Sequence, residues 1–225
     1  GIIIFGAGEV ARLIGACLKE SGRDVTLVSS SRINLEEALD KNLNAVEANI
    51  HSDTLDEKLE LADVGYILAM TGNDEDNFYI QNYYLNREGL RGNYRLISKK
   101  EIVNSRYSSD SLFGPYATFL LLNRSARRIG TISQLVINET AMLGETVDIL
   151  RKQKLIPLYV QCAVSGDVSF IPANDNTVEI APGDILFYLG EPVDSELLPS
   201  KIIQPAAMKD LDEDQLMDDK GISVG

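Results

Sequence analysis

Ile2-Ile3-Ile4-Phe5-Gly6-Ala7-Gly8-Glu9-Val10-Ala11 opens the chain and decides its fold. A run of β-branched and aromatic residues meets a glycine-rich turn, and residues 10–18 then place apolar side chains at helical spacing. This order predicts a buried strand, a tight turn and a helix. A second apolar strand follows at residues 25–28, which makes the opening a βαβ unit.

The spacing G-x-G-x-x-A indicates a phosphate-binding turn. Gly6 permits the sharp turn, Gly8 lets a pyrophosphate approach the backbone, and Ala11 lets the helix pack closely on the strand. The helix N-terminus supplies free N–H groups and a partial positive charge. A plain structural βαβ turn is the alternative, and the position between strand and helix favours nucleotide binding.

The first 105 residues continue to alternate strand and helix. Residues 45–48, 64–70 and 94–98 are predicted strands, and 34–39 (with Asn34 as N-cap), 53–61 and 77–86 are predicted helices. This repetition predicts a parallel, doubly wound sheet whose ligand lies at the carboxyl ends of the strands. The glycine turn and residues 29–32, 48–49 and 71–77 all follow strands, so we expect them to converge on one crevice.

The pattern changes after Asn104. Residues 107–114 read as a polar loop, and 116–129 have helical spacing with a basic end and a stop at Gly130. Beyond them the predicted strands are 135–137, 158–164, 169–171 and 185–189, with one helix at 146–153 and a tight turn at 182–184.

The predicted fold class is therefore α/β: a Rossmann-like doubly wound parallel sheet followed by a small α+β C-terminal lobe. The expected organisation is a nucleotide-binding domain (1–105), a linker and helix (106–130), the small lobe (131–204) and an acidic, solvated tail (205–225).

Composition excludes several classes of function. The 225 residues carry a formal net charge of −13, which disfavours binding to nucleic acid or to an anionic membrane surface. Cys17 and Cys162 both lie in apolar patterns and read as buried, reduced thiols of a cytosolic protein. No apolar run reaches the roughly 20 residues of a membrane helix. The chain begins on its first strand without an initiator Met, so we expect it to be a fragment.

The end of the second strand leaves the identity of the nucleotide open. An NAD site usually places an acidic residue there, but this chain has Ser29-Ser30-Ser31-Arg32. Hydroxyl and guanidinium donors could hold the 2′-phosphate of NADP(H), or the serines could simply cap the next helix. The predicted ligand is an adenine nucleotide: NAD(H) or NADP(H) first, with AMP, ADP or ATP as alternatives.

Three groups of motifs resemble the RCK family, also called KTN or Trk-type nucleotide-binding domains. These are the opening turn Gly6-Ala7-Gly8-Glu9-Val10-Ala11, the turn at 71–77, and a C-terminal group. The C-terminal group is formed by Leu143-Gly144-Glu145-Thr146-Val147 and by Ile171-Pro172 with 180–186. The resemblance covers nearly all of residues 1–204. It implies a cytosolic regulatory module of a potassium channel, uptake system or cation:proton antiporter, in the same chain or as a separate subunit at the inner face of the membrane. It also implies a homodimer, and a possible ring of dimers, joined through a crossover helix at 116–129; an ordinary helix packed on its own domain is the alternative.

The resemblance further implies site residues, position by position. Expected phosphate contacts are Gly6, Ala7, Gly8, Glu9 and Val10; expected ribose contacts are Ser29, Ser30 and Arg32; Ala48 and Asn49 would lie near the adenine, and Thr71, Gly72 and Asn77 would flank the ligand. Lys99 is either a further phosphate contact or a surface lysine.

An NAD(P)-dependent oxidoreductase is the alternative function. His51, the one histidine, could approach the crevice but reads as a surface-loop residue, and no tyrosine is followed four positions later by lysine. The sequence therefore predicts no catalytic residue and no metal site.

Overall fold

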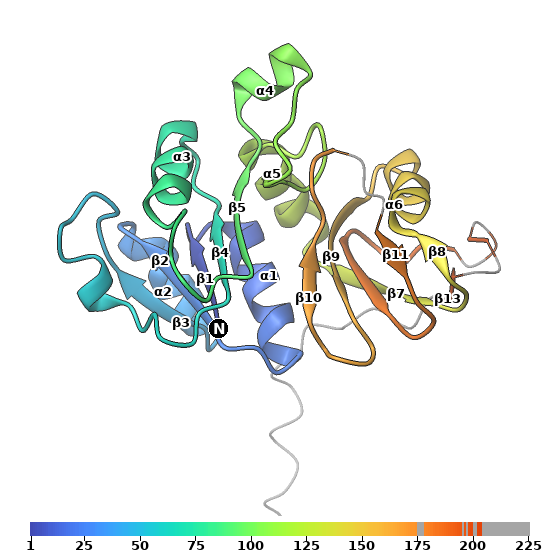
Figure 1. Cartoon of the computed structure of the whole chain (residues 1–225), viewed down its shortest axis with the longest axis horizontal. Coiled ribbons are helices and arrows are strands. Elements are labelled where there is room, and N and C mark those ends of the chain that lie inside the picture. The colour runs from blue at the N-terminus through green and yellow to red at the C-terminus, as the bar shows by residue number, and fades with distance from the viewer. Residues whose placement is uncertain (175–177, 195, 197, 200–201, 204–225) are drawn as a thin grey trace, which may run out of the picture.

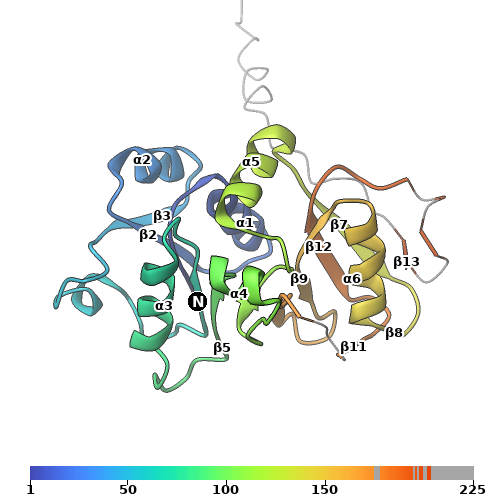
Figure 2. The same ribbon diagram turned by 90° about the horizontal axis from the view of Figure 1, so that it is seen from above.

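The structure is a computed structural model that describes residues 1–174, 178–194, 196, 198–199 and 202–203. Figures 1 and 2 show two lobes side by side, each built around its own sheet, with one helix, α5 (Phe119–Ile129), above the junction. The acidic tail at 205–225 lies outside the described residues. In the part of the chain that the structure describes, no helix is both long and apolar enough to cross a membrane.

The first lobe holds a six-stranded parallel sheet in the order β3-β2-β1-β4-β5-β6. Its strands are β1 (Ile2–Phe5), β2 (Val25–Ser29), β3 (Asn44–Glu47), β4 (Tyr66–Ala69), β5 (Gly92–Leu96) and β6 (Ser111–Leu112). Strand β1 lies in the middle, where Ile4 pairs with Leu27 on one side and Leu68 on the other. This is the order of a doubly wound nucleotide-binding sheet, so the predicted fold class is confirmed.

Both faces of this sheet are buried, which is why β1 is an unbroken apolar run. Ile2 and Ile4 pack with the apolar side chains of two helices, whereas Ile3 and Phe5 face the opposite core. The helices on the first face are α1 (Glu9–Glu20) and α2 (Arg32–Asp40), and α3 (Asp74–Tyr83) lies on the second. Because α2 begins at Arg32 after Ser31, the prediction of Asn34 as its N-cap is wrong.

Two other helix predictions need correction. The expected helix at 53–61 is a single 3₁₀ turn, η1 (Asp56–Lys58), since only Leu55, Leu59 and Leu61 of this stretch are buried. Helix α3 begins at Asp74, three residues early, because the Asn73 side chain caps it by accepting the N–H of Asp76 at 3.1 Å.

The stretch at 107–114, which reads as a polar loop, contains strand β6, in which Ser111 is fully buried. Helix α4 (Lys99–Asn104) precedes it, where the sequence predicts no element. Helix α4 starts at a capping box in which Ser98 and Glu101 satisfy each other's backbone N–H groups. These polar residues can be buried because Ser98 and Ser111 both donate hydrogen bonds to the Glu101 carboxylate.

The second lobe holds an antiparallel five-stranded sheet in the order β10-β9-β12-β7-β13 and a two-stranded sheet of β11 and β8. The strands are β7 (Ile132–Ile137), β8 (Ala141–Met142), β9 (Ile156–Gln161), β10 (Val168–Phe170), β11 (Glu179–Ile180), β12 (Ile185–Leu189) and β13 (Ile202–Ile203). Helix α6 (Leu143–Lys152) packs on them. The two-residue strands β8, β11 and β13 are too short for a period-2 pattern to reveal.

The turn at 182–184 is structural. The buried Asp184 carboxylate accepts the N–H of Ala163 and of Ala181, each at 2.9 Å, so it ties the turn to the end of β9.

The two lobes touch through side chains of β9 and β10. The Tyr159 hydroxyl donates to the Cys17 sulfur on α1 at 3.1 Å, and the Tyr66 and Phe170 rings meet edge to face at 5.7 Å. Cys17 and Cys162 are not joined by a disulfide. Cys17 is buried as expected, but Cys162 is only partly buried, because β9 ends at Gln161 and Cys162 lies between this strand and the turn at 163–165.

Candidate functional site

The glycine turn joins three strand ends. The Gly6 N–H donates to the Val28 carbonyl at 2.8 Å, and a Cβ built on Gly6 would lie 2.5 Å from the Met70 carbonyl oxygen. The φ of Gly6 is +111°, a conformation that side chains rarely adopt. Only glycine therefore allows β1, β2 and β4 to end this close together, as the sequence indicates.

Gly8 is the N-cap of α1 and offers no capping side chain of its own. The helix still presents the N–H groups of its first turn, and Ala11 is fully buried against the sheet. The N–H of Val10 donates to the Asn123 side chain of α5 at 3.1 Å, so a distant residue supplies the cap.

The serine cluster at the end of β2 makes local contacts. The Ser29 hydroxyl accepts the N–H of Ser31 at 3.1 Å, and Ser30 is exposed. Arg32 is exposed and lies 3.7 Å from Glu47, a carboxylate at the end of β3. Residues 29–32 include no acidic residue, but the sheet brings the Glu47 carboxylate from the neighbouring strand.

Ala48 and Asn49 continue from β3. Ala48 is buried and donates its N–H to the Ser29 carbonyl at 3.1 Å. The Asn49 side chain accepts the N–H of His51 at 3.0 Å, so it shapes the following turn. The imidazole of His51 lies 3.1 Å from the Asp76 carboxylate, and its side chain is 53% exposed.

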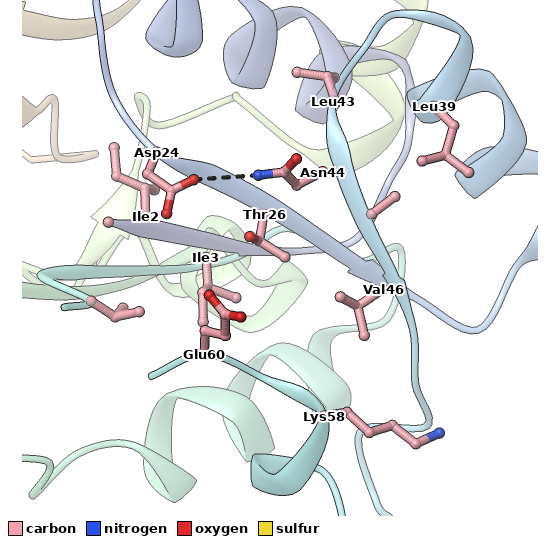
Figure 3. Close-up of a pocket in the computed structure, with 13 residues that line it drawn as sticks. Ile2, Ile3, Asp24, Thr26, Leu39, Leu43, Asn44, Val46, Lys58 and Glu60 are labelled. Atoms are coloured by element: carbon pink, nitrogen blue, oxygen red, sulfur yellow. Dashed lines mark hydrogen bonds between the residues drawn. The ribbon is translucent and has the colours of Figure 1, made fainter. Parts of the chain in front are cut away.

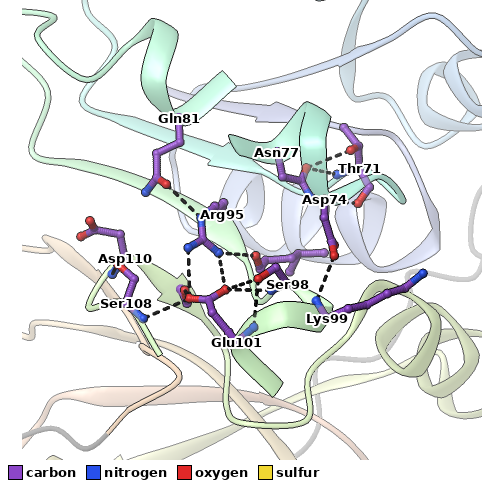
Figure 4. Close-up of polar contacts among 12 residues, drawn as sticks. Thr71, Asp74, Asn77, Gln81, Arg95, Ser98, Lys99, Glu101, Ser108 and Asp110 are labelled. Carbon is purple, nitrogen blue, oxygen red and sulfur yellow. Dashed lines mark hydrogen bonds and ion pairs between the residues drawn. The ribbon is translucent and has the colours of Figure 1, made fainter. Parts of the chain in front are cut away.

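The turn after β4 is held by one side chain. The Asn77 side-chain oxygen accepts the Thr71 N–H and hydroxyl, each at 2.9 Å, and its nitrogen donates to the Thr71 carbonyl at 3.1 Å (Figure 4). Asn77 is 2% exposed. Both polar atoms of the Asn77 side chain bond to Thr71, so Asn77 fixes the conformation of this turn.

Lys99 begins α4, after the end of β5. Its backbone N–H donates to Asp74 at 2.9 Å, while its side chain is exposed (Figure 4). This bond ties the start of α4 to the start of α3.

The structure therefore brings the expected residues to one edge of the sheet. The contacts above join the turns after β1, β2, β3, β4 and β5 at their carboxyl ends. The arrangement offers backbone donors and hydroxyls at the edge where parallel sheets bind ligands.

Sequence reasoning missed two residues of α5 at this edge. Asn123 caps α1, and the ring of Phe119 lies 3.5 Å from a Cβ built on Gly8 and 3.1 Å from one built on Gly72. The helical spacing of 116–129 placed both on a helix, but no local signal places that helix over the glycine turn.

A buried ion pair that the sequence did not predict lies next to the site. Arg95 of β5 and Glu101 of α4 form bonds of 2.6 and 3.0 Å (Figure 4). Burial opposes ionisation of Glu101, but hydrogen bonds from Arg95, Ser111, Ser108 and Ser98 outweigh it and hold the pKa of Glu101 well below its ordinary value.

Cavities also lie away from this edge of the sheet. One of about 390 Å³ is at the amino ends of β1, β2 and β3, where Asp24 and Asn44 bond at 3.3 Å (Figure 3). A more apolar hollow of about 480 Å³ lies beside α5 and includes Leu121, Leu155 and Arg128 in its lining. Among the described residues, no group of three or more His, Cys, Asp or Glu side chains could hold a metal ion.

Comparison with known proteins finds one match to a family model, in the first lobe. Residues 2–97 match the family model of the TrkA-N domain. A search of curated proteins gave no significant match.

Several solved structures are similar to parts of the chain. The NAD(P)-binding domain of an exopolyphosphatase-related protein from Archaeoglobus fulgidus is 22% identical, with a TM-score of 0.38, over 44% of this chain and 75% of that one. The TrkA-N domain of the Escherichia coli inner membrane protein YbaL is 15% identical, with a TM-score of 0.37, over 46% of this chain and 91% of that one. The GsuK channel bound to NAD is 13% identical, with a TM-score of 0.39, over 84% of this chain and only 37% of that one.

Proposed function

We propose that the TrkA-N domain formed by residues 2–97 binds NAD(H) at the carboxyl ends of its strands. The Gly6-Ala7-Gly8 turn carries this proposal. Gly6 adopts a backbone conformation that favours glycine, and Gly8 places no side chain of its own between a diphosphate and the start of α1. The N–H groups of Glu9 and Val10 then supply the donors.

The ribose end favours NAD(H) over NADP(H). Glu47 lies beside Arg32, and its carboxylate would accept ribose hydroxyls but repel a 2′-phosphate. Ser29 and Ser30 add hydroxyls at the same edge. AMP, ADP and ATP share the adenosine half of the ligand and are competing outcomes of the test.

Calorimetric titration tests the ligand. The whole chain is titrated with NADH, NAD⁺, NADPH, AMP, ADP and ATP, and Lys99→Ala is compared with Lys100→Ala. Both lysines are exposed and adjacent in α4. If Lys99 reaches a phosphate, its loss weakens binding about tenfold, whereas Lys100→Ala binds as the wild type does. Absence of binding for all six nucleotides would refute the proposal.

The nucleotide acts as a signal in this proposal and is not consumed. His51 is half-exposed and its nearby partner is Asp76, so the site offers no enclosed acid or base at that position. Nicotinamide-dependent reduction of small carbonyl compounds by the purified chain would instead support the oxidoreductase alternative.

The output of this signal would be the state of a potassium or other monovalent cation transporter at the inner face of the membrane. The TrkA-N match and the RCK-like motifs support this proposal. Binding energy can bias such a partner only if the nucleotide prefers one of two geometries of the assembly.

The assembly that the nucleotide controls would be a dimer, or a ring of dimers, joined through α5. Tyr116, Leu120 and Leu121 leave apolar surface exposed there, and Leu121 also lines the hollow beside the helix. Sedimentation with and without the nucleotide tests the assembly. Leu121→Glu is expected to shift it toward monomers, and a wild type that is monomeric at all concentrations would contradict the dimer.

A further inference from the structure

Helix α5 lies on the phosphate end of the candidate site. Its Asn123 side chain is 5% exposed, and its oxygen accepts the Val10 N–H at 3.1 Å. Its nitrogen donates to the Phe119 carbonyl at 2.8 Å, which fixes the amide orientation. The Val10 N–H is one of the donors at the start of α1 that would bond to a phosphate oxygen. The Asn123 side-chain oxygen therefore occupies the position of that phosphate oxygen.

The ring of Phe119 fills the gap between two glycine turns. A Cβ on Gly8 would be 3.5 Å from one ring carbon, and a Cβ on Gly72 would be 3.1 Å from another. A diphosphate that runs from the start of α1 toward the turn after β4 has to pass between these glycines. The ring and the diphosphate therefore exclude each other.

The rest of α5 anchors the helix to the same site. Leu122 and Ala126 are buried in the core that α1 shares, and Arg127 lies 3.7 Å from Glu9, the first residue of α1. The opposite side exposes Leu120, which is 73% exposed. Contacts to the glycine turn thus come from one face of α5.

We propose that α5 is a built-in competitor of the nucleotide. Asn123 and Phe119 occupy the phosphate subsite, and a nucleotide binds when the first turns of α5 move off it. This regulation rests on the proposed function, because it concerns the same site. It adds that ligand binding and α5 docking are mutually exclusive, and it names the two side chains responsible.

The competitor is connected directly to the second lobe. Helix α5 ends at Gly130, and β7 starts at Ile132, so a single residue separates the cap from the strand. Strand β7 lies within the five-stranded sheet between β12 and β13. Movement of α5 therefore pulls on the second lobe, and by linkage anything that holds this lobe in place changes nucleotide affinity.

Two substitutions at one position test the competition by opposite effects. Asn123→Ala removes the acceptor and leaves the Val10 N–H free, so nucleotide binding should tighten about two- to tenfold. Asn123→Asp keeps an acceptor and adds a negative charge at a helix N-terminus, so α5 docks more firmly and binding should weaken. Phe119→Ala should tighten binding as Asn123→Ala does.

The measurement is calorimetric titration of the full chain with NADH and with ADP, and thermal unfolding confirms that each variant folds. Leu120→Ala is the control, because it truncates an apolar side chain of the same helix on the exposed face. Equal affinity for wild type and all variants, or weaker binding by Asn123→Ala, would overturn the competitor while leaving nucleotide binding intact. Failure of every protein to bind would refute the proposed function itself and the competition with it.

Discussion

Arg95 and Glu101 form a buried ion pair that joins β5 to α4, with two parallel hydrogen bonds of 2.6 and 3.0 Å. The same carboxylate accepts the Ser111 hydroxyl at 2.6 Å and the Ser108 N–H at 3.0 Å. One side chain thus fixes the start of α4, the following loop and strand β6. The guanidinium carbon of Arg95 also lies over the Phe78 ring, 4.0 Å from its centre.

Glu101→Gln is expected to destabilise the protein by about 3–5 kcal/mol, because it leaves the Arg95 charge buried without its partner. Urea unfolding followed by circular dichroism measures the change. Glu88→Gln makes the same chemical change at an exposed position and should alter the free energy of unfolding by less than about 0.5 kcal/mol. Similar losses for both variants would show that the ion pair contributes little.

The ion pair also predicts how stability depends on pH. The pKa of Glu101 is lowered in the folded state, so the unfolded state takes up the proton first as the pH falls. The contribution of this carboxylate is therefore complete above the ordinary glutamate pKa, about 4.3, and is lost as the pH falls toward the folded pKa. The difference in unfolding free energy between wild type and Glu101→Gln should shrink between about pH 5 and pH 3. A difference that stays constant over this range would contradict the assigned pKa shift.

The strands of both lobes could largely be read from the sequence, because their apolar patterns are local. The run at 185–189 is β12, and the glycine turn joins β1 to α1 as its spacing predicts. Buried polar structure was missed, because its partners are far apart or polar themselves. Ser111 lies in the stretch 107–114 that reads as a polar loop, yet its hydroxyl donates to the Glu101 carboxylate inside the protein.

In the candidate site, too, local features could be predicted from the sequence and contacts between distant residues could not. Gly6 and Gly8 are local signals, and their positions at the turn were predictable. The approach of Asn123 to Val10 spans 113 positions, and that of Glu47 to Arg32 depends on which strands are neighbours. Contacts of this kind depend on the packing of α5 and on strand order, which no short stretch encodes.

Gly6→Ala is expected to destabilise the chain by about 3 kcal/mol or more, because it adds a clash to an unfavourable φ. The added Cβ would lie 2.5 Å from the Met70 carbonyl oxygen. Gly22→Ala separates the two effects: Gly22 has a φ of +80° just beyond α1, but no atom lies within 4 Å of a Cβ built on it. This control should cost about 1 kcal/mol. Equal costs in thermal or urea unfolding would show that the turn can widen to accept a side chain.

The two cysteines should differ in reactivity toward a thiol reagent such as DTNB. Burial raises the pKa of Cys17 to about 11, and the hydrogen bond from Tyr159 only partly offsets it. Hydrogen bonds from Ser165 lower the pKa of Cys162, which is also more accessible. At pH 8 the thiolate of Cys162 should react first, while Cys17 reacts only as the protein opens. Cys162→Ser should remove the fast phase and Cys17→Ser should keep it; the reverse assignment would contradict the packing of Tyr159 on α1.

Arg32 and Glu47 should set the preference between the two dinucleotides if the proposed site is right. In the wild type the carboxylate lies 3.7 Å from the guanidinium, so a 2′-phosphate meets both charges at once. Glu47→Gln removes the repulsion and should raise the affinity for NADPH relative to NADH about two- to fivefold, a range typical of exposed charge pairs. Arg32→Ala in the same background should cancel the gain, because the remaining donors are uncharged hydroxyls. Titration at low ionic strength gives the largest effect, since salt screens exposed charges. If Glu47→Gln changes the affinities for NADPH and NADH by the same factor, the ribose end of the ligand does not lie between the ends of β2 and β3.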